Sequence, residues 1–205
     1  MNDSATFVSP RYSTQVSGQA AAGSDAYGKF IYGNSMYNWT STAYLDGWGI
    51  SSNGSTDPCK SCHASGRIPS GGTSNTSDWA KLTNGASNFR SWSSNTVSTN
   101  TNATLYRYPW GSRYGTTTYG SITVVSNSSF ADGKNYVAIM PASGNRDYGS
   151  GALFDAGTYG YYSSSLCYSS RYAYYMDFNS SNVFAGNDYG TYRAYGRSVR
   201  CVAEF

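Results

Sequence analysis

The chain has 205 residues, a formal net charge of +3 and only 12% charged residues, so no strong charge directs it to nucleic acid or to a membrane surface. Glycine (23 residues) and tyrosine (21 residues) are abundant, whereas Glu204 is the only glutamate, which excludes a largely helical protein. Aromatic residues make up 17% of the chain and argue against disorder, because their side chains bury large areas on folding.

The chain divides into a polar arm and one folded domain. Residues 1–26 are small and polar and contain no signal-peptide core, and no apolar stretch in the sequence is long enough to cross a bilayer. We expect an N-terminal arm over 1–26 and one domain over 27–205, a length that suits a single hydrophobic core. The segment TSDWAKLTNG (76–85) predicts a helix, since Ser77 can cap its N-terminus and Gly85 can end it.

The strand patterns are short and rich in aromatic or β-branched residues. SITVV and NYVAIM predict strands, and the second is almost entirely apolar and is expected to be buried. YAYYMDF alternates, with Tyr174, Met176 and Phe178 on one face and Tyr175 and Asp177 on the other. The expected strands cover 28–33, 34–39, 121–125, 135–140, 172–178 and 198–202, and a loop is expected over 93–104. The pattern indicates a mostly-β domain with one or two short helices.

The sequence CKSCH (59–63) matches the C-x-x-C-H pattern of covalent haem attachment. Haem bound through Cys59 and Cys62, with His63 as an axial ligand, is one interpretation, and a zinc site completed by Cys167 or Cys201 is another. One or two disulfides form the simpler interpretation of four cysteines, and a Cys59–Cys201 bridge would contribute about 4 kcal/mol or more. Haem pockets are usually helical, so a redox domain is the lesser alternative, and we predict no cofactor and no metal.

No catalytic constellation is present. His63 is the only histidine and lies within the cysteine motif, and a G-x-S-x-G elbow is missing. GSGALFDAG is glycine-rich but matches neither a Walker A motif nor G-x-G-x-x-G. We predict that the protein is not an enzyme.

The C-terminal part interleaves tyrosine and arginine with serine, glycine and asparagine. This composition is typical of antibody paratopes, and Tyr and Arg are frequent hot-spot residues of interfaces. Stacking on single-stranded nucleic acid is a weaker alternative, because Asp177 and Asp188 dilute the positive charge. Tyr136, Tyr162 and Tyr174 are expected to stabilise the core or the sheet rather than to bind a ligand.

Four segments extend this interpretation: YGNSMYNWTSTA (32–43), DPCKSCHASGRIPSGGTSNTSDWAKL (57–82), AIMPASGNRDYGSGALFDAGTYGYYSSS (138–165) and YAYYMDFNSSNVFAGNDYGTYRAYGRSVRCV (172–202). Their order and spacing resemble the bacterial major-paralogous-domain family, within the C-type-lectin-like and formylglycine-generating-enzyme-like superfamily. The resemblance implies an α+β, C-type-lectin-like fold with small twisted antiparallel sheets, and it supports a Cys59–Cys201 bridge. Ser163 and Arg197 depart from that pattern, which often has Trp and Phe at these positions.

In some members of this superfamily, diversity-generating retroelements vary the C-terminal ligand-binding surface. The present chain resembles those members in the residue types of its C-terminal part. Mutated AAC codons in such proteins never give Lys, Glu, Gln, Trp or Met. Residues 157–202 contain no Lys, Glu, Gln or Trp, and their single methionine is Met176 on the predicted buried face. The resemblance therefore implies a diversified segment over about 157–200.

We expect a receptor-binding or adhesion protein of a phage or bacterial surface, at the virion surface or the extracellular or cell surface. Its partner is expected to be a protein or glycan receptor, with no nucleic acid, no membrane insertion and oligomerisation through the N-terminal arm as an option. An undiversified surface or pilus-associated structural module of the same fold is the alternative. The candidate ligand-binding residues are Tyr161, Ser163, Leu166, Cys167, Tyr168, Arg171, Tyr172, Phe184, Asn187, Asp188, Tyr189, Thr191, Tyr192, Tyr195 and Arg197.

Overall fold

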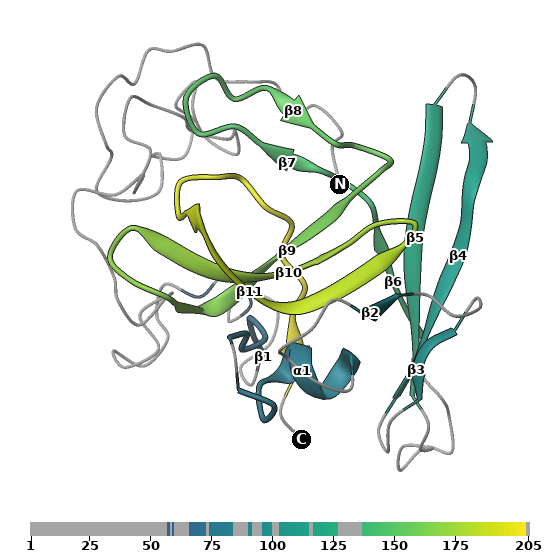
Figure 1. Ribbon diagram of the computed structural model, residues 1–205, viewed down its shortest axis with the longest axis horizontal. Coiled ribbons are helices and arrows are strands. Elements are labelled where there is room, and N and C mark those ends of the chain that lie inside the picture. The colour runs from purple at the N-terminus through teal and green to yellow at the C-terminus, as the bar shows by residue number, and fades with distance from the viewer. Residues whose placement is uncertain are drawn as a thin grey trace.

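The computed structural model describes Asp57, Cys59 and the ranges 66–72, 74–83, 90–91, 96–99, 103–114, 117–126 and 137–203. The expected N-terminal arm and the expected strands at 28–33 and 34–39 lie outside these residues. Within them the chain forms small antiparallel sheets and one short helix (Figure 1). This arrangement agrees with the expected loop-rich, α+β class.

Four sheets organise the described residues. The central sheet has the order β2 (Arg90–Ser91), β11 (Asn182–Tyr192), β10 (Tyr172–Phe178), β9 (Gly160–Cys167). The long sheet has the order β3 (Thr96–Thr99), β4 (Ala103–Tyr114), β5 (Thr117–Ser126), β6 (Val137–Pro141). Two small sheets pair β1 (Gly66–Arg67) with β12 (Val202–Ala203), and β7 (Asn145–Arg146) with β8 (Leu153–Phe154).

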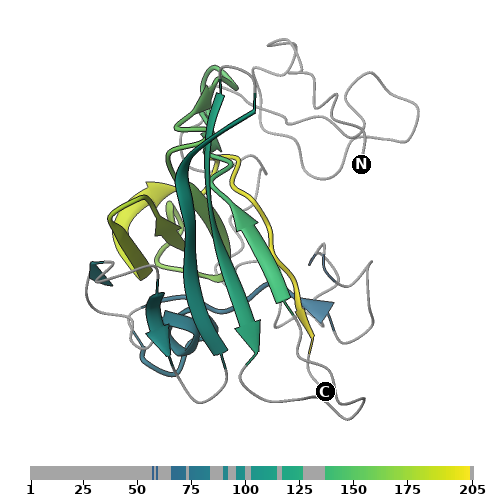
Figure 2. The same ribbon diagram turned by 90° about the vertical axis from the view of Figure 1, so that its right-hand side faces the viewer.

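The core lies where the two large sheets and the helix meet. Helix α1 (Asp78–Thr83) lies below the β9–β11 sheet in Figure 1, and the β7–β8 hairpin lies above it. Figure 2 shows β4 and β5 running side by side past the central sheet. The buried cluster draws its side chains from α1, β5, β6, β9, β10 and β11, and comprises Trp79, Ile122, Met140, Ala142, Tyr162, Met176, Phe178, Val183 and Ala185.

Close packing between β9 and β10 fixes this core. Phe178 occupies the space above Gly160, where an added Cβ would lie 2.2 Å from the Phe178 Cζ. Tyr162 stacks on Phe178 with ring centroids 5.9 Å apart and donates its hydroxyl proton to the Pro141 carbonyl at 2.9 Å. The prediction of Tyr162 as a core tyrosine is confirmed. Tyr174 is half-buried, and Tyr136 lies outside the described residues.

Several predicted elements are confirmed. The helix predicted within 76–85 forms as α1, and the Ser77 hydroxyl accepts the Ala80 backbone N–H at 3.2 Å as a cap does. The strand predicted over 172–178 is β10, and that predicted over 121–125 lies within β5.

Three other predictions need correction. Residues 93–104 are not all loop, because β3 and the start of β4 lie there; a threonine-rich strand on a sheet edge resembles a polar loop in composition. The strand predicted over 135–140 forms as β6 where the structure describes it, but it is not wholly buried: Ile139 is 58% exposed because only one face of β6 meets the core. The strand predicted over 198–202 is confined to Val202 and Ala203, since Ser198 bridges to β9 instead.

A disulfide joins Cys59 to Cys201 across 142 residues of sequence, which confirms the predicted pairing. Cys59 is fully buried, and the Asp57 carboxylate accepts the backbone N–H groups of Cys59 and Ile68 at 2.8 and 2.9 Å. Cys201 precedes β12, which pairs with β1 through Arg67 and Val202. The bridge therefore fastens the end of the domain to its first described strand.

The double change Cys59→Ser with Cys201→Ser is expected to lower the free energy of unfolding by about 5 kcal/mol, the chain-entropy value for so long a loop. Urea unfolding followed by circular dichroism measures this loss. Cys167→Ser is the matched control, because Cys167 takes no part in the disulfide. An equal loss in the control would contradict the structural role of the bridge.

Helix α1 is also held by a charged contact at its first residue. The Asp78 carboxylate accepts hydrogen bonds from the Arg67 guanidinium, and from the backbone N–H and the hydroxyl of Ser70, each at 2.7 Å. Burial raises the pKa of Asp78, but these hydrogen bonds outweigh it and lower that pKa to about 2. The folded protein therefore favours the ionised carboxylate.

Asp78→Asn is expected to destabilise the protein at pH 7 by on the order of 1–2 kcal/mol, allowing for solvent screening of a partly exposed pair. Because the folded-state pKa is depressed, this stabilisation is full above the ordinary pKa of 3.8 and is lost as pH falls through about 2. Unfolding free energies of both proteins between pH 7 and pH 2 measure the effect. A difference that stays constant down to pH 2 would contradict the lowered pKa.

Candidate functional site

The face of the central sheet opposite the core carries polar and aromatic side chains. Residues directly paired in an antiparallel sheet share a face. Met176 pairs with Tyr162 on the core side, whereas Tyr175 pairs with Ser163 and Asp177 pairs with Tyr161 on the other side. The predicted alternation along β10 therefore separates packing residues from a second, tyrosine-rich layer.

One group of rings gathers where β10, β11 and the turn after β7 meet. Tyr172 and Tyr192 stack with centroids 5.5 Å apart, and the rings of Tyr192 and Tyr195 are parallel within 2° at 6.4 Å. Tyr148 meets the edges or faces of both Tyr192 and Tyr195 nearly at right angles, at 5.4 and 5.1 Å. These offset-stacked and T-shaped arrangements are the favoured geometries for aromatic pairs.

A second group of rings follows β9. Tyr159 stacks on Tyr161 at 5.6 Å, and Tyr161 lies 6.1 Å from Tyr175. The Tyr161 hydroxyl donates to the Asp155 carboxylate at 2.9 Å. Burial, and then this hydrogen bond to Asp155, raise the pKa of Tyr161 far above its ordinary value. The phenol therefore stays protonated and remains a hydrogen-bond donor.

Arg197 connects the two groups. Its Cζ lies 4.2 Å from the centroid of the Tyr175 ring and 6.0 Å from that of Tyr195. The Nε and Nη2 atoms are buried and have no hydrogen-bond partner within the described part of the chain. Burial lowers the pKa of Arg197 to about 10, and Tyr175, Tyr195 and Asp177 oppose that change. We call the seven rings that these contacts link the tyrosine network: Tyr148, Tyr159, Tyr161, Tyr172, Tyr175, Tyr192 and Tyr195.

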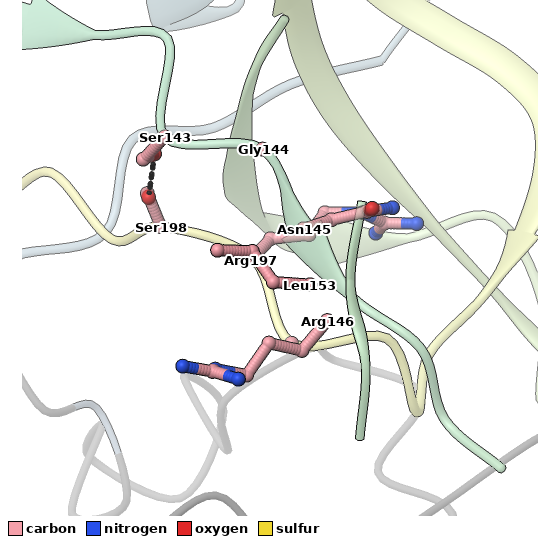
Figure 3. A pocket seen from close by; sticks show the side chains of 8 residues that line it. Ser143, Gly144, Asn145, Arg146, Leu153, Arg197 and Ser198 are labelled. Atoms are coloured by element: carbon pink, nitrogen blue, oxygen red, sulfur yellow. Dashed lines mark hydrogen bonds between the residues drawn. The ribbon is translucent and has the colours of Figure 1, made fainter. Parts of the chain in front are cut away.

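A shallow pocket of about 350 Å³ lies beside the tyrosine network, between the β7–β8 hairpin and residues 196–198. Figure 3 shows the hydroxyls of Ser143 and Ser198 joined on one wall, at 2.6 Å. The side chains of Arg146 and Arg197 extend in opposite directions in this view. Arg146 donates to the Gly151 carbonyl at 3.2 Å. The guanidinium of Arg197 points away from the pocket and lies over the Tyr175 ring of the tyrosine network.

Six of the predicted ligand-binding residues lie in or next to the turn between β9 and β10 and are at least partly exposed. Leu166 is 41% and Tyr168 is 55% exposed, and Arg171 is also exposed. Tyr168 touches Tyr174 in a T-shaped contact at 5.7 Å. The remaining members of this group, which are half-buried, are Cys167, Tyr172 and Thr191.

Other predicted residues are placed differently. Phe184 is only 7% exposed, which leaves little of its ring for a ligand. The Ser163 backbone N–H donates to the Ser198 carbonyl at 2.9 Å, so this residue also holds the 196–198 segment against β9. Tyr161, Tyr192, Tyr195 and Arg197 belong to the linked layer described above. Asn187, Asp188 and Tyr189 lie in β11, and their side chains are outside the described residues.

Sequence reasoning missed three rings of the network. Tyr148 lies in the turn of the β7–β8 hairpin and Tyr159 follows β8, and neither was among the predicted binding residues. Tyr175 was placed on the correct face by alternation but was not expected to contact Arg197. The alternation of Tyr159 with Tyr161 is the one sequence signal that could have added Tyr159 to the predicted binding residues.

The disulfide removes Cys59 from the lesser haem interpretation, and it removes both Cys59 and Cys201 from the zinc interpretation. Cys62 and His63 lie outside the described residues. Over the ranges that the structure describes, no helix has the length and apolar character needed to cross a membrane.

Comparison with known families adds one match. A family described as a domain of unknown function (DUF8237) matches residues 112–202. No curated protein and no solved structure matches the chain. The matched range contains all of β5 and the strands that carry the tyrosine network.

Tyr192→Ala is expected to lower the free energy of unfolding by about 2 kcal/mol, because Tyr192 contacts Tyr148, Tyr172 and Tyr195. Tyr168→Ala is the matched control and is expected to cost less than about 1 kcal/mol, since the ring is 55% exposed. Urea unfolding midpoints compare the two variants. Equal losses would show that the linked rings do not support one another.

Proposed function

We propose that this chain is a ligand-binding protein that recognises a protein or glycan receptor through its tyrosine-rich C-terminal surface. The observation that carries the proposal is the tyrosine network, in which six of seven rings are half-buried and keep part of their surface outside. Rings that pack against one another are rigid before a ligand arrives. Binding then costs little side-chain entropy, which is the advantage of tyrosine in paratopes.

The exposed turn between β9 and β10 extends this surface. Leu166 and Tyr168 offer apolar area, and Arg171 offers a charged donor beside them. A single protein-binding site of ordinary size would bury on the order of 800 Å² on each partner. Multivalent display, for example through oligomerisation by the N-terminal arm, would compensate for weak single sites.

The C-type-lectin-like scaffold and diversification by a retroelement remain part of this proposal. They are supported by the four sequence segments quoted above and by the residue types over 157–202. The disulfide supports a virion-surface, extracellular or cell-surface location, because such bonds persist in oxidising surroundings. The proposal assigns the chain no chemical reaction.

An undiversified surface or pilus-associated module is the second candidate. It is favoured by the same contacts, because Tyr175 is 7% exposed and several other rings stabilise one another. Genes for sibling proteins distinguish the two. Differences confined to the candidate binding residues, beside a reverse transcriptase gene, support diversification, whereas differences that spare the tyrosines contradict it.

A direct binding test uses fluorescently labelled protein on a glycan array and on bacterial cells. Tyr168→Ala combined with Arg171→Ala is expected to weaken binding at least tenfold, because it removes an exposed ring and a charge without touching the core. Ile139→Thr is the matched control, since Ile139 is equally exposed but lies on β6 in the other sheet. Equal binding by the double variant, or an equal loss in the control, would contradict the proposed surface.

A further inference from the structure

The backbone on both sides of Arg197 is fixed by main-chain hydrogen bonds. Gly196 exchanges two bonds with Arg146 of β7, at 2.8 and 3.0 Å. Ser198 exchanges two with β9, donating to the Tyr161 carbonyl at 3.0 Å and accepting from the Ser163 N–H at 2.9 Å. Residue 197 is therefore held between two strands, and its side chain is directed over Tyr175.

The surroundings of the Arg197 guanidinium attract a cation. Tyr175 lies against its face and Tyr195 stands to one side. Asp177 follows Tyr175 on the same face of β10, and Tyr161 is its partner on β9. The Asp177 carboxylate and the ring faces of Tyr175 and Tyr195 favour the charged form of the guanidinium. We call Tyr161, Tyr175, Asp177 and Tyr195 the arginine cage.

The way in which the cage holds its cation differs from that of an ordinary arginine site. Arginine is usually fixed by hydrogen bonds from several of its N–H groups to carboxylates or carbonyls. Here Nε and Nη2 are buried, and no described residue accepts a hydrogen bond from either. Ring faces and a nearby carboxylate therefore supply the attraction, as in cation–π sites for ligands. Such a site recognises a flat cation and does not require that the cation belong to the same chain.

We propose that the arginine cage is a guanidinium-binding site that this chain fills with its own Arg197. Residue 197 then decides whether the cage is closed or can accept an arginine side chain of a bound protein. This inference rests on the proposed recognition function for its biological meaning. Position 197 is among the residues that the sequence predicts to vary, so a sibling with a small residue there would present an open cage with a preference for arginine.

The test opens the cage and adds the missing group as a separate molecule. Arg197→Ala protein is titrated with N-methylguanidinium chloride by calorimetry and by thermal unfolding, up to about 20 mM, well below denaturing concentrations. We expect saturable binding with a Kd on the order of 1 mM, typical of so small a ligand, and an increase in Tm. N-methylurea, which is neutral and has nearly the same shape, is expected to bind at least tenfold more weakly.

Two proteins serve as matched controls. The wild-type chain is expected to show no saturable response, because its cage is filled. Arg171→Ala removes the same charge from an exposed position and is also expected to show none. A response to N-methylurea as large as that to N-methylguanidinium, or equal responses in the controls, would overturn the inference.

Arg197→Ala can fail to fold, since it leaves a cavity beside a buried carboxylate. N-methylguanidinium is then expected to restore the folded circular-dichroism signal, and absence of rescue would overturn the inference. Arg197→Met provides an independent test. The apolar methionine side chain fills the cage, so the folded variant is expected to show no saturable binding of N-methylguanidinium. A saturable response in Arg197→Met would overturn the inference too.

The outcome is separable from that of the proposed function. Binding of N-methylguanidinium to the opened cage is measured without a receptor. If Tyr168→Ala with Arg171→Ala leaves receptor binding intact, the proposed surface fails while the cage can still bind its probe. If N-methylguanidinium does not bind the Arg197→Ala protein but Tyr168→Ala with Arg171→Ala loses receptor binding, only the inference about the arginine cage is wrong.

Discussion

Strand β10 sets the constraint on which both layers of the domain depend. Its alternate residues must serve two environments at once, because Met176 and Phe178 close the core while Tyr175 and Asp177 support the opposite face. A slip of one residue in its pairing with β9 would exchange these faces. The contact of Phe178 with Gly160 opposes such a slip, since no other residue leaves room for the ring there. The surface is thus positioned by the same register that builds the core.

Alternation predicted β10 and capping residues predicted α1, because both are local signals. The Cys59–Cys201 pairing was supported by the family resemblance, since the cysteines alone allow several pairings. The sequence did not allow β3 to be predicted, since threonine and serine in an edge strand resemble a loop. Arg197 was predicted to face a ligand but turns inward over Tyr175. That direction depends on main-chain bonds from Gly196 and Ser198 to two separate strands, which no nearby residue encodes.

Under the proposed function, the tyrosine network combines stability with recognition. Six of the seven rings pack against neighbouring rings and still leave part of their surface exposed, so under the proposed function a partner would meet a rigid surface. The energetic cost of this arrangement is concentrated at Arg197, because its buried Nε and Nη2 atoms have no hydrogen-bond acceptor among the residues that the structure describes. The ring faces of Tyr175 and Tyr195 offset part of that cost. The match of residues 112–202 to one family covers this linked layer together with the strands that position it.

The position of the disulfide has a mechanical consequence. Tension applied to points before Cys59 and after Cys201 passes through the covalent bridge and bypasses the 141 residues between the two cysteines, one fewer than their sequence separation of 142. The whole tyrosine network lies within that bypassed segment. A receptor bound to these rings would thus be carried by a module that the pull along the chain does not stretch. Such shielding suits a protein that must hold a surface under shear.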